Sequence, residues 1–474
     1  MNNSLFDEFQ QVTKDDWVRQ AIKDLKGKDF EKELVSKTLD GIQIQPFYAK
    51  EDLEGLDLVK SYQNQVNPKS HVPGLPPRNW SNVFSVSVKD EKSDNREILD
   101  ALQNGSDALL LHLEGDENLD DLLKGVGLEY IQIFLQPVGD ALKVAKLFVQ
   151  WLIKNNLLPE GIHGALLFDF YAELLVAKRP IDRIVSEAKQ LLEIFKPFKG
   201  FKAFSINYAF YHNAGASTVQ ELSFATGAYI DLLDTLTVSG LNAHEIFEKT
   251  VLHTAIGSSY FEEVSKLRAM RILFHQLGLL YGVNIHPEEI FIFSETSSWS
   301  KSPFDVNTNM LRNTTETMSA ILGGTSALLV RPHDEVNGQE NSFSKRMARN
   351  ISNILREESY MDKVVDPVAG SYYLESMTFE ILKMVKMKLE EIEVKGGWSQ
   401  LYFNHSIQRE VKAVRKSRQE SILEGAKAKI GSNKYRLNEE ESTAFASKEL
   451  SEQEWMLLAS RETILLESSK TLKS

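Results

Sequence analysis

The sequence has no cysteine among its 474 residues. Disulfide bonds and thiolate metal sites are therefore excluded within this chain. Long apolar runs are also missing, since runs such as Ala108–Leu111 fall far short of the ~20 residues that span a bilayer. The first residues, Met1–Leu5, lack the basic and then apolar pattern of a signal peptide. We expect a cytoplasmic protein that does not enter a membrane.

Positive charge is outnumbered by negative charge. The chain has 54 Lys and Arg against 67 Asp and Glu, a formal net charge of −13, and no long acidic run. Such a composition disfavours nucleic acids and anionic membranes as partners. The hydrophobic share of 42% is enough for a large core. A barrel of roughly 250 residues or more folds as one unit, so the length does not require several domains.

Several common catalytic motifs are absent. There is no Gly-x-x-x-x-Gly-Lys-Ser/Thr loop and no Gly-x-Ser-x-Gly elbow, and His244-Glu245 is followed by Glu248 where a zinc protease has its second histidine. We predict no metal site. Three histidines lie near predicted elements, namely His212, His253 and His275. A lone histidine at such a place is more often a core or surface residue than a catalyst.

Short apolar runs alternate with amphipathic helices from Val83 onward, and this alternation is typical of βα units. Each run is bounded by turn residues, as expected of strands buried on both faces. The predicted strands are Val83–Val88, Ala108–Leu113, Tyr130–Leu135, Ala165–Phe170, Ala203–Tyr208, Glu289–Phe293 and Ser326–Val330, with an eighth near Leu236–Val238. The pattern predicts an α/β fold, a (β/α)8 TIM barrel.

Two other segments flank the predicted barrel, which we place at residues 51–400. Residues 1–50 form an N-terminal arm with a helical stretch that ends at Gly27 and an extended segment, Gly41–Tyr48. A long helix ends at Gly396-Gly397. Residues 401–474 form a C-terminal helical segment, basic at first and with a short helix predicted around Glu452–Leu466.

One short segment, Phe293–Ser300, resembles the segment His-x-Gln-Thr-Ser-Gly-Trp-Ser of methylmalonyl-CoA mutases. Other motifs match the barrel part of that family in order and spacing over residues 15–435. They are Trp17 with Leu25 and Gly27, Thr38-x-x-Gly41-Ile42-x-Ile44-x-Pro46-x-Tyr48, Arg78-x-Trp80, Ala214-Gly215-Ala216 with Glu221-Leu222, Lys266-x-Arg268-Ala269-x-Arg271, Gly323-Gly324-Thr325, Ala348-Arg349-Asn350, Glu357-Glu358-Ser359, Asp366-Pro367-x-x-Gly370-Ser371-Tyr372 and Asn433-Lys434-Tyr435. The collinear set implies that the family's fold is kept.

The same resemblance implies that the family's chemistry is lost. Its reaction moves a thioester group of a CoA ester by a radical from adenosylcobalamin, so its site needs donors for the carbonyl and a cation for the carboxylate. The matching positions here carry Val83, Ser85, Leu167, Ala177, Phe210, Thr250 and Phe293. Polar residues left near the expected pocket are Arg78, Asp169, His212 and Glu295. We therefore expect a barrel packed shut by apolar side chains.

The chain also lacks the motif Asp-x-His-x-x-Gly of the family's cobalamin-binding domain. We therefore predict that it binds no cofactor and acts as the small, non-catalytic subunit of a heterodimer, whose large subunit binds adenosylcobalamin. The resemblance implies that the arm contacts the partner, with candidate interface residues Trp17, Ile22, Leu25 and Ile42.

Two other interpretations remain. One is an autonomous acyl-CoA-binding isomerase with a remodelled pocket that uses His212, Arg78 and Glu295, together with a separate cobalamin-binding chain. The other is a scaffold that pairs with itself as a homodimer, a state that is also open to the chain expressed alone.

Overall fold

A computed structural model describes residues 12–56, 61–62, 65–68, 74–177, 179–338, 340–436 and 452–471. At its centre is a parallel sheet with the order β7-β6-β5-β4-β3-β11-β10-β9-β8. The strands are β3 (Ser81–Ser87), β4 (Ala108–Leu113), β5 (Gln132–Pro137), β6 (His163–Leu166), β7 (Phe201–Lys202), β8 (Phe204–Asn207), β9 (Thr250–Ile256), β10 (Ile292–Thr296) and β11 (Ala327–Leu329).

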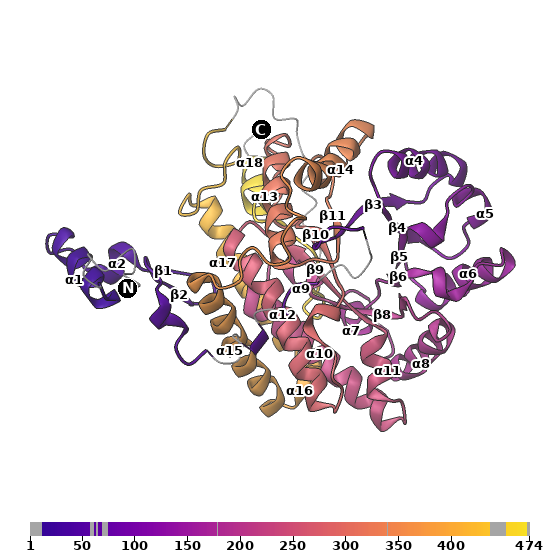
Figure 1. Cartoon of the computed structure of the whole chain (residues 1–474), viewed down its shortest axis with the longest axis horizontal. Helices are drawn as coiled ribbons and strands as arrows, with labels where there is room; N and C mark the ends of the chain where they lie inside the picture. The colour runs from indigo at the N-terminus through magenta and orange to yellow at the C-terminus, as the bar shows by residue number, and fades with distance from the viewer. Residues whose placement is uncertain are drawn as a thin grey trace, which may run out of the picture.

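The sheet closes because β7 and β8 are two halves of one strand, interrupted at Ala203. β7 pairs with β6, and β8 pairs with β9. At the break, the backbone N–H of Ala203 donates to the carbonyl of Lys249, and two residues later that of Ser205 donates to Phe168. The result is an eight-stranded barrel with helices outside it (Figure 1), which confirms the predicted fold class.

The predicted eighth strand was wrong in position. Leu236–Val238 form the last turn of α10 (Thr218–Val238), and the strand is β9, Thr250–Ile256. Helix α10 continues through the β-branched Thr237 and Val238 because Leu232, Leu233 and Leu236 all face the core. The strand predicted at Glu289–Phe293 also began too early, because β10 starts at Ile292. A 3₁₀ turn, Pro287–Glu289, precedes it.

The remaining elements surround the barrel or flank it. The helices are α4 (Glu91–Gln103), α5 (Leu119–Leu122), α6 (Ala141–Lys154), α7 (Phe170–Leu174), α8 (Ile184–Phe195), α9 (Tyr208–Asn213), α11 (Ala243–Glu248), α12 (Tyr260–Leu280), α13 (Thr308–Gly323), α14 (Ser342–Glu357), α15 (Tyr372–Val394), α16 (Gly397–Phe403), α17 (Ser406–Leu423) and α18 (Ile464–Thr471). The 3₁₀ turns are Lys50–Leu53, Leu128–Tyr130, Pro159–Gly161, Ile181–Arg183, Pro287–Glu289 and Glu335–Asn337. Among the described ranges, no helix is both long and apolar enough to cross a bilayer.

The barrel interior is filled by apolar side chains that form a cluster separate from the main core. We call this cluster the apolar plug. Its members are Val83, Ala108, Leu110, Phe134, Ala165, Leu167, Val251, Phe293, Ala327 and Leu329. Phe134 and Phe293 meet edge to face with ring centroids 4.8 Å apart. The centre of the barrel is therefore packed rather than hollow, as the apolar strand residues predicted.

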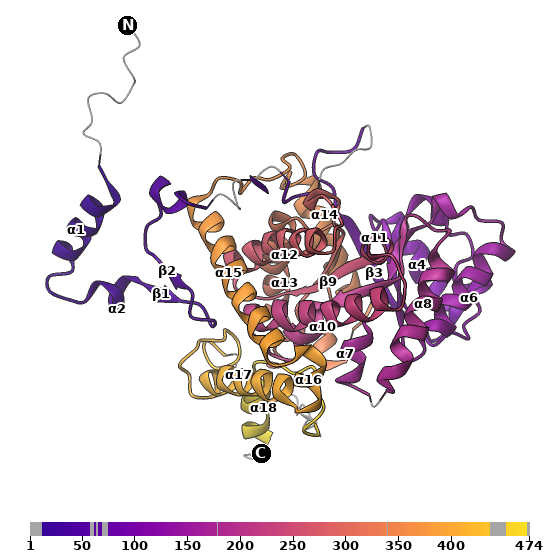
Figure 2. The same cartoon turned by 90° about the horizontal axis from the view of Figure 1, so that it is seen from below.

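The N-terminal arm stands away from the barrel (Figure 2). Its helices α1 (Lys14–Asp24) and α2 (Phe30–Leu34) contain no buried residue. The hairpin of β1 (Ser36–Lys37) and β2 (Gln43–Ile44) instead anchors the arm, because Asp40 accepts hydrogen bonds from the Ser217 hydroxyl and the Val219 N–H at the start of α10. The arm is thus fixed at its root and exposed at its helices.

Residues 452–463 are not the short helix that the sequence predicted. They run across the loops that follow β6, β8 and β10, and we call them the strap. The strap N–H groups of Leu457, Ser460 and Glu462 donate to the carbonyls of Leu175, Asn213 and Trp299 at 2.8, 2.8 and 3.1 Å. These hydrogen bonds replace the ones that a helix would make, so the segment is ordered by the barrel.

Candidate functional site

Polar side chains form a layer directly above the apolar plug, at the carboxyl ends of the strands. In an eight-stranded α/β barrel this end, the mouth, is where active sites lie. The layer arises because inward-facing positions alternate along each strand, so a polar residue follows an apolar one on the same face. Its members are Ser85, His112, Asp169, His253, Glu295 and Arg331.

Glu295 and Arg331 form the central ion pair of this layer. Glu295 Oε2 lies 2.7 Å from Arg331 Nη2, and Arg331 Nη1 lies 2.6 Å from Glu335 Oε1. Burial alone would raise the pKa of Glu295, but Arg331 and His253 outweigh burial and lower that pKa to about 2. The guanidinium of Arg331 therefore already has two carboxylates as partners.

His253 lies beneath this pair, on β9. Its Nε2 is 3.7 Å from Glu295 Oε2, and its ring packs edge-on against Phe293 with centroids 5.3 Å apart. Neither ring nitrogen has a hydrogen-bond partner within the part of the chain that the structure describes. The histidine is buried, so its contact with Glu295 is its main polar interaction.

Asp169 occupies the end of β6 and accepts hydrogen bonds from backbone groups. The N–H groups of Tyr171 and Ala172 donate to Oδ1, and that of Asn207 donates to Oδ2, at 2.9, 3.1 and 2.8 Å. Burial raises the pKa of this carboxyl, which these hydrogen bonds only partly offset. Asp169 thus caps α7 and links it to β8, a structural role.

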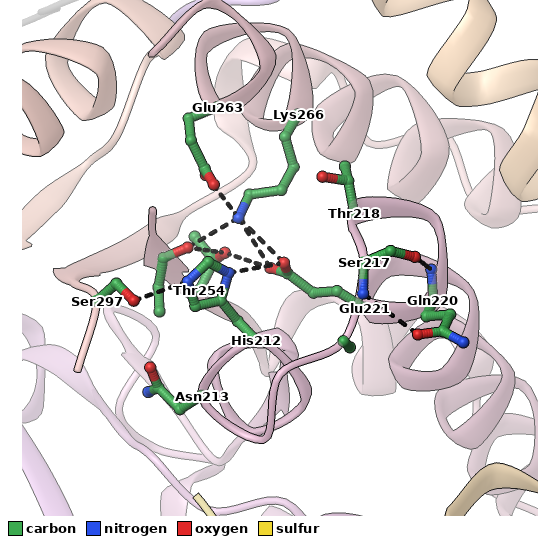
Figure 3. Close-up of polar contacts among 12 residues, drawn as sticks. His212, Asn213, Ser217, Thr218, Gln220, Glu221, Thr254, Glu263, Lys266 and Ser297 are labelled. Atoms are coloured by element: carbon green, nitrogen blue, oxygen red, sulfur yellow. Dashed lines mark hydrogen bonds and ion pairs between the residues drawn. The ribbon is translucent and has the colours of Figure 1, made fainter. Parts of the chain in front are cut away.

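A second polar cluster surrounds Lys266, beside the mouth (Figure 3). Lys266 Nζ on α12 lies 3.0 Å from Glu221 Oε1 on α10 and 2.7 Å from Glu263 Oε2. His212 Nδ1 on α9 lies 3.2 Å from Glu221 Oε2, and His212 Nε2 lies 2.8 Å from the Ser297 hydroxyl. All five residues are buried, so the cluster joins three helices and the loop after β10.

The charges in this cluster balance locally. Burial works against the charge on Lys266, but Glu221 and Glu263 outweigh it and raise the lysine pKa. Burial likewise opposes the charge on Glu221, while Lys266 and His212 lower that carboxyl's pKa. A cavity of about 680 Å³ between the arm hairpin and the first turns of α10 and α12 borders His212, Glu221 and Glu263.

The residues predicted at the family's catalytic positions do not all meet. Val83, Leu167 and Phe293 lie together in the apolar plug, and Ser85 lies just above it. Phe210 packs against Tyr211 on α9 instead.

The other predicted positions lie elsewhere. Thr250 is at the opposite end of the barrel, where its hydroxyl donates to Ile246 O at 2.7 Å. Ala177 is exposed after α7.

Three of the four residual polar candidates, Asp169, His212 and Glu295, are at the mouth. Asn213 links two of them, because it follows His212 and its amide donates to Glu295 Oε1 at 3.4 Å. Arg78 is at the opposite end, where its guanidinium donates to the carbonyls of Asn79 and Thr325, and burial lowers its pKa to about 9. Arg78 thus braces the barrel floor and does not reach the other three.

Comparison with known proteins identifies the family. The sequence profile of methylmalonyl-CoA mutase matches residues 111–462. The chain belongs to the methylmalonyl-CoA mutase family. It is 32% identical over 440 residues to a methylmalonyl-CoA mutase small subunit from Porphyromonas gingivalis, covering 91% of this chain and 71% of that subunit.

Longer relatives also match this mutase-family chain. It is 27% identical over 473 residues to a methylmalonyl-CoA mutase from Cereibacter sphaeroides, covering 90% of this chain and 65% of that protein. It is 28% identical over 469 residues to the mitochondrial methylmalonyl-CoA mutase of Bos taurus, covering 91% of this chain and 62% of that protein. The chain thus spans less than two thirds of these two proteins.

The mouth of this mutase-family barrel does not fit the family's substrate and cofactor. The plug offers no cation for a carboxylate, and the guanidinium of Arg331 is held between Glu295 and Glu335. Ser85, one of the residues predicted at the family's catalytic positions, is hydrogen-bonded to His112 at 3.0 Å.

Sequence reasoning missed three members of the mouth layer of this mutase-family barrel. His112 and Arg331 each follow an apolar strand run, and His253 lies inside one. A signal was present, since a polar residue two positions after a buried one on the same strand faces the same side of the sheet. His253 was considered only as a lone histidine, because its strand had not been recognised.

Proposed function

We propose that this chain is the non-catalytic small subunit of a heterodimeric methylmalonyl-CoA mutase. The large subunit would bind adenosylcobalamin and interconvert methylmalonyl-CoA and succinyl-CoA, while this chain stabilises it. The observation that carries the proposal is the apolar plug, where the family's reaction needs hydrogen-bond donors and a cation. Burying a carboxylate against these side chains without a partner would cost several kcal/mol.

The strap supports the same conclusion. It covers the loops after β6, β8 and β10, which together with β9 make up half of the mouth. Glu462 fixes it, with carboxylate oxygens 3.3 Å from Arg418, 2.9 Å from Lys427 and 2.9 Å from Lys429. The cations overcome the effect of burial and hold the pKa of Glu462 well below its usual range. A cobalamin-binding chain docking here would have to displace this segment.

The arm is the proposed contact with the large subunit. Trp17 stacks on Phe47 with ring centroids 5.0 Å apart, and Ile22 on the same helix is 49% exposed. Leu25 is half-buried, whereas Ile42 is buried in the chain's own core. Helices that bury nothing within their own chain are suited to a permanent interface, which commonly buries more than about 2,000 Å². We place the complex in the cytoplasm.

Co-purification with a mutase large subunit from the same genome tests the proposal. We expect a stable heterodimer, and we expect Ile22→Asp to weaken association at least about 10-fold because it puts a charge into an apolar contact. Ile153→Asp is the matched control, since Ile153 is 68% exposed on α6, far from the arm. Failure to form any complex, or equal effects of the two substitutions, would contradict the proposal.

A further inference from the structure

The strap leaves the other half of the mouth uncovered, and a cavity of about 290 Å³ opens there. It lies at the ends of β3, β4 and β11, between the first turns of α4 and α14. Its lining combines aliphatic side chains, such as Val83 and Leu329, with polar ones, Ser85, Ser87, His112 and Arg331. Charged side chains from α4, α14 and the adjoining loops, including Glu97, Glu335 and Lys345, complete it. The subunit role proposed above makes no use of this cavity.

Ser85 and His112 lie side by side in the lining of this cavity, on the adjacent strands β3 and β4. Ser85 Oγ lies 3.0 Å from His112 Nε2, and both residues are half-buried. Both point to the barrel interior, because Val83 and Leu110, two residues before each, belong to the apolar plug. The serine hydroxyl is thus hydrogen-bonded to a base and also borders the cavity.

His112 is neutral at physiological pH. Burial, followed by the positive charge of Arg331, lowers its pKa to about 4, while Glu295 acts weakly in the opposite direction. A neutral imidazole carries one proton, so Nε2 can accept from Ser85 when Nδ1 holds that proton. The pair therefore has the protonation state in which a histidine takes a proton from a serine.

We propose that Ser85 and His112 form an acyl-transfer site that hydrolyses small esters or thioesters. Ser85 Oγ would bond to the acyl carbon while His112 Nε2 takes its proton. The bond to the leaving alcohol or thiol then breaks, and His112 returns the proton to that group. Water next attacks the acyl-serine with His112 as base, releasing the carboxylic acid and restoring Ser85.

The cavity limits the substrate to a short acyl group. Its volume is at the lower end of small-molecule sites, and Val83 and Leu329 offer aliphatic surface for only a few carbon atoms. Among the residues that the structure describes, no acidic side chain is hydrogen-bonded to His112, and the low pKa of His112 makes it a weak base. We therefore expect slower turnover than in a complete Ser-His-Asp triad.

The test uses the purified full-length chain with a fluorophosphonate probe and with p-nitrophenyl butyrate. We expect a phosphonyl adduct on Ser85 by peptide mass spectrometry, absent in Ser85→Ala. His112→Gln should slow both labelling and ester turnover about 100-fold, the lower end of the contribution of a general base, because His112 is a weak base. Ser87→Ala is the matched control, because Ser87 lines the same cavity two residues along the same strand.

Two results would overturn this site. One is labelling or turnover that persists in Ser85→Ala, and the other is an equal loss in Ser87→Ala. Ser85→Cys keeps the test decisive if the alanine variant unfolds, since iodoacetamide should alkylate its thiol faster with His112 present than with His112→Gln. These readouts need no partner subunit, so their outcome is separate from that of the heterodimer experiment.

Discussion

Replacing Lys266 by methionine is expected to lower the free energy of unfolding by about 3–5 kcal/mol. The substitution leaves Glu221 and Glu263 buried without the ammonium group that both carboxylates contact, although it preserves most of the side-chain volume. Lys266 is fully buried, and its ammonium also donates to the Ala255 carbonyl at 2.8 Å. Removing one partner of a buried ion pair leaves an uncompensated charge, which costs more than the pair contributes.

Urea unfolding of the two proteins, followed by circular dichroism, measures this difference. Lys154→Met is the matched control, because Lys154 pairs with Asp120 at the surface, where both side chains are about half exposed. Such exposed pairs contribute roughly 0–1 kcal/mol. A Lys266→Met protein as stable as the control variant would show that the cluster does not hold the helices together.

Replacing Phe293 by alanine should also destabilise the barrel by about 3–5 kcal/mol. Phe293 is fully buried in the apolar plug, where its ring meets Phe134 and His253. Alanine would leave a cavity at the centre of a closed barrel, where the surrounding strands cannot collapse to fill it.

The control for this prediction is Phe403→Ala on α16, whose side chain is 59% exposed. Surface substitutions of this kind usually change stability by about 0.5 kcal/mol or less. The same urea experiment compares both variants with the unmodified chain. Similar small losses in the two variants would mean that the barrel interior is loosely filled, contrary to the packing described above.

Much of the fold could be predicted from apolar runs, because a buried parallel strand is apolar on both faces. β3 and β4 were placed within two residues of their positions. The strand Thr250–Ile256 was missed because His253 and two threonines interrupt its apolar pattern, while Leu236–Val238 resembles a strand locally. Packing of α10 against the core overrides that local preference.

The site was predictable to a lesser degree. The plug followed from the apolar residues at motif positions, since alternation along a strand fixes which residues face inward. Phe210 was misplaced because its position on the short helix α9 turns it toward Tyr211. The contacts of Arg331 with Glu295 and Glu335 depend on how β10 and β11 pair, which sequence spacing alone does not specify.

The division of labour between two subunits is tested most directly by asking which chain binds the cofactor and turns over substrate. The isolated chain, a large subunit and their complex would be compared for adenosylcobalamin binding by absorbance and for isomerisation of methylmalonyl-CoA. We predict that the cofactor binds only where the large subunit is present and that this chain alone neither binds it nor forms succinyl-CoA. Cofactor binding or isomerase turnover by this chain, alone or with a cobalamin-binding protein that has no barrel of its own, would contradict the account.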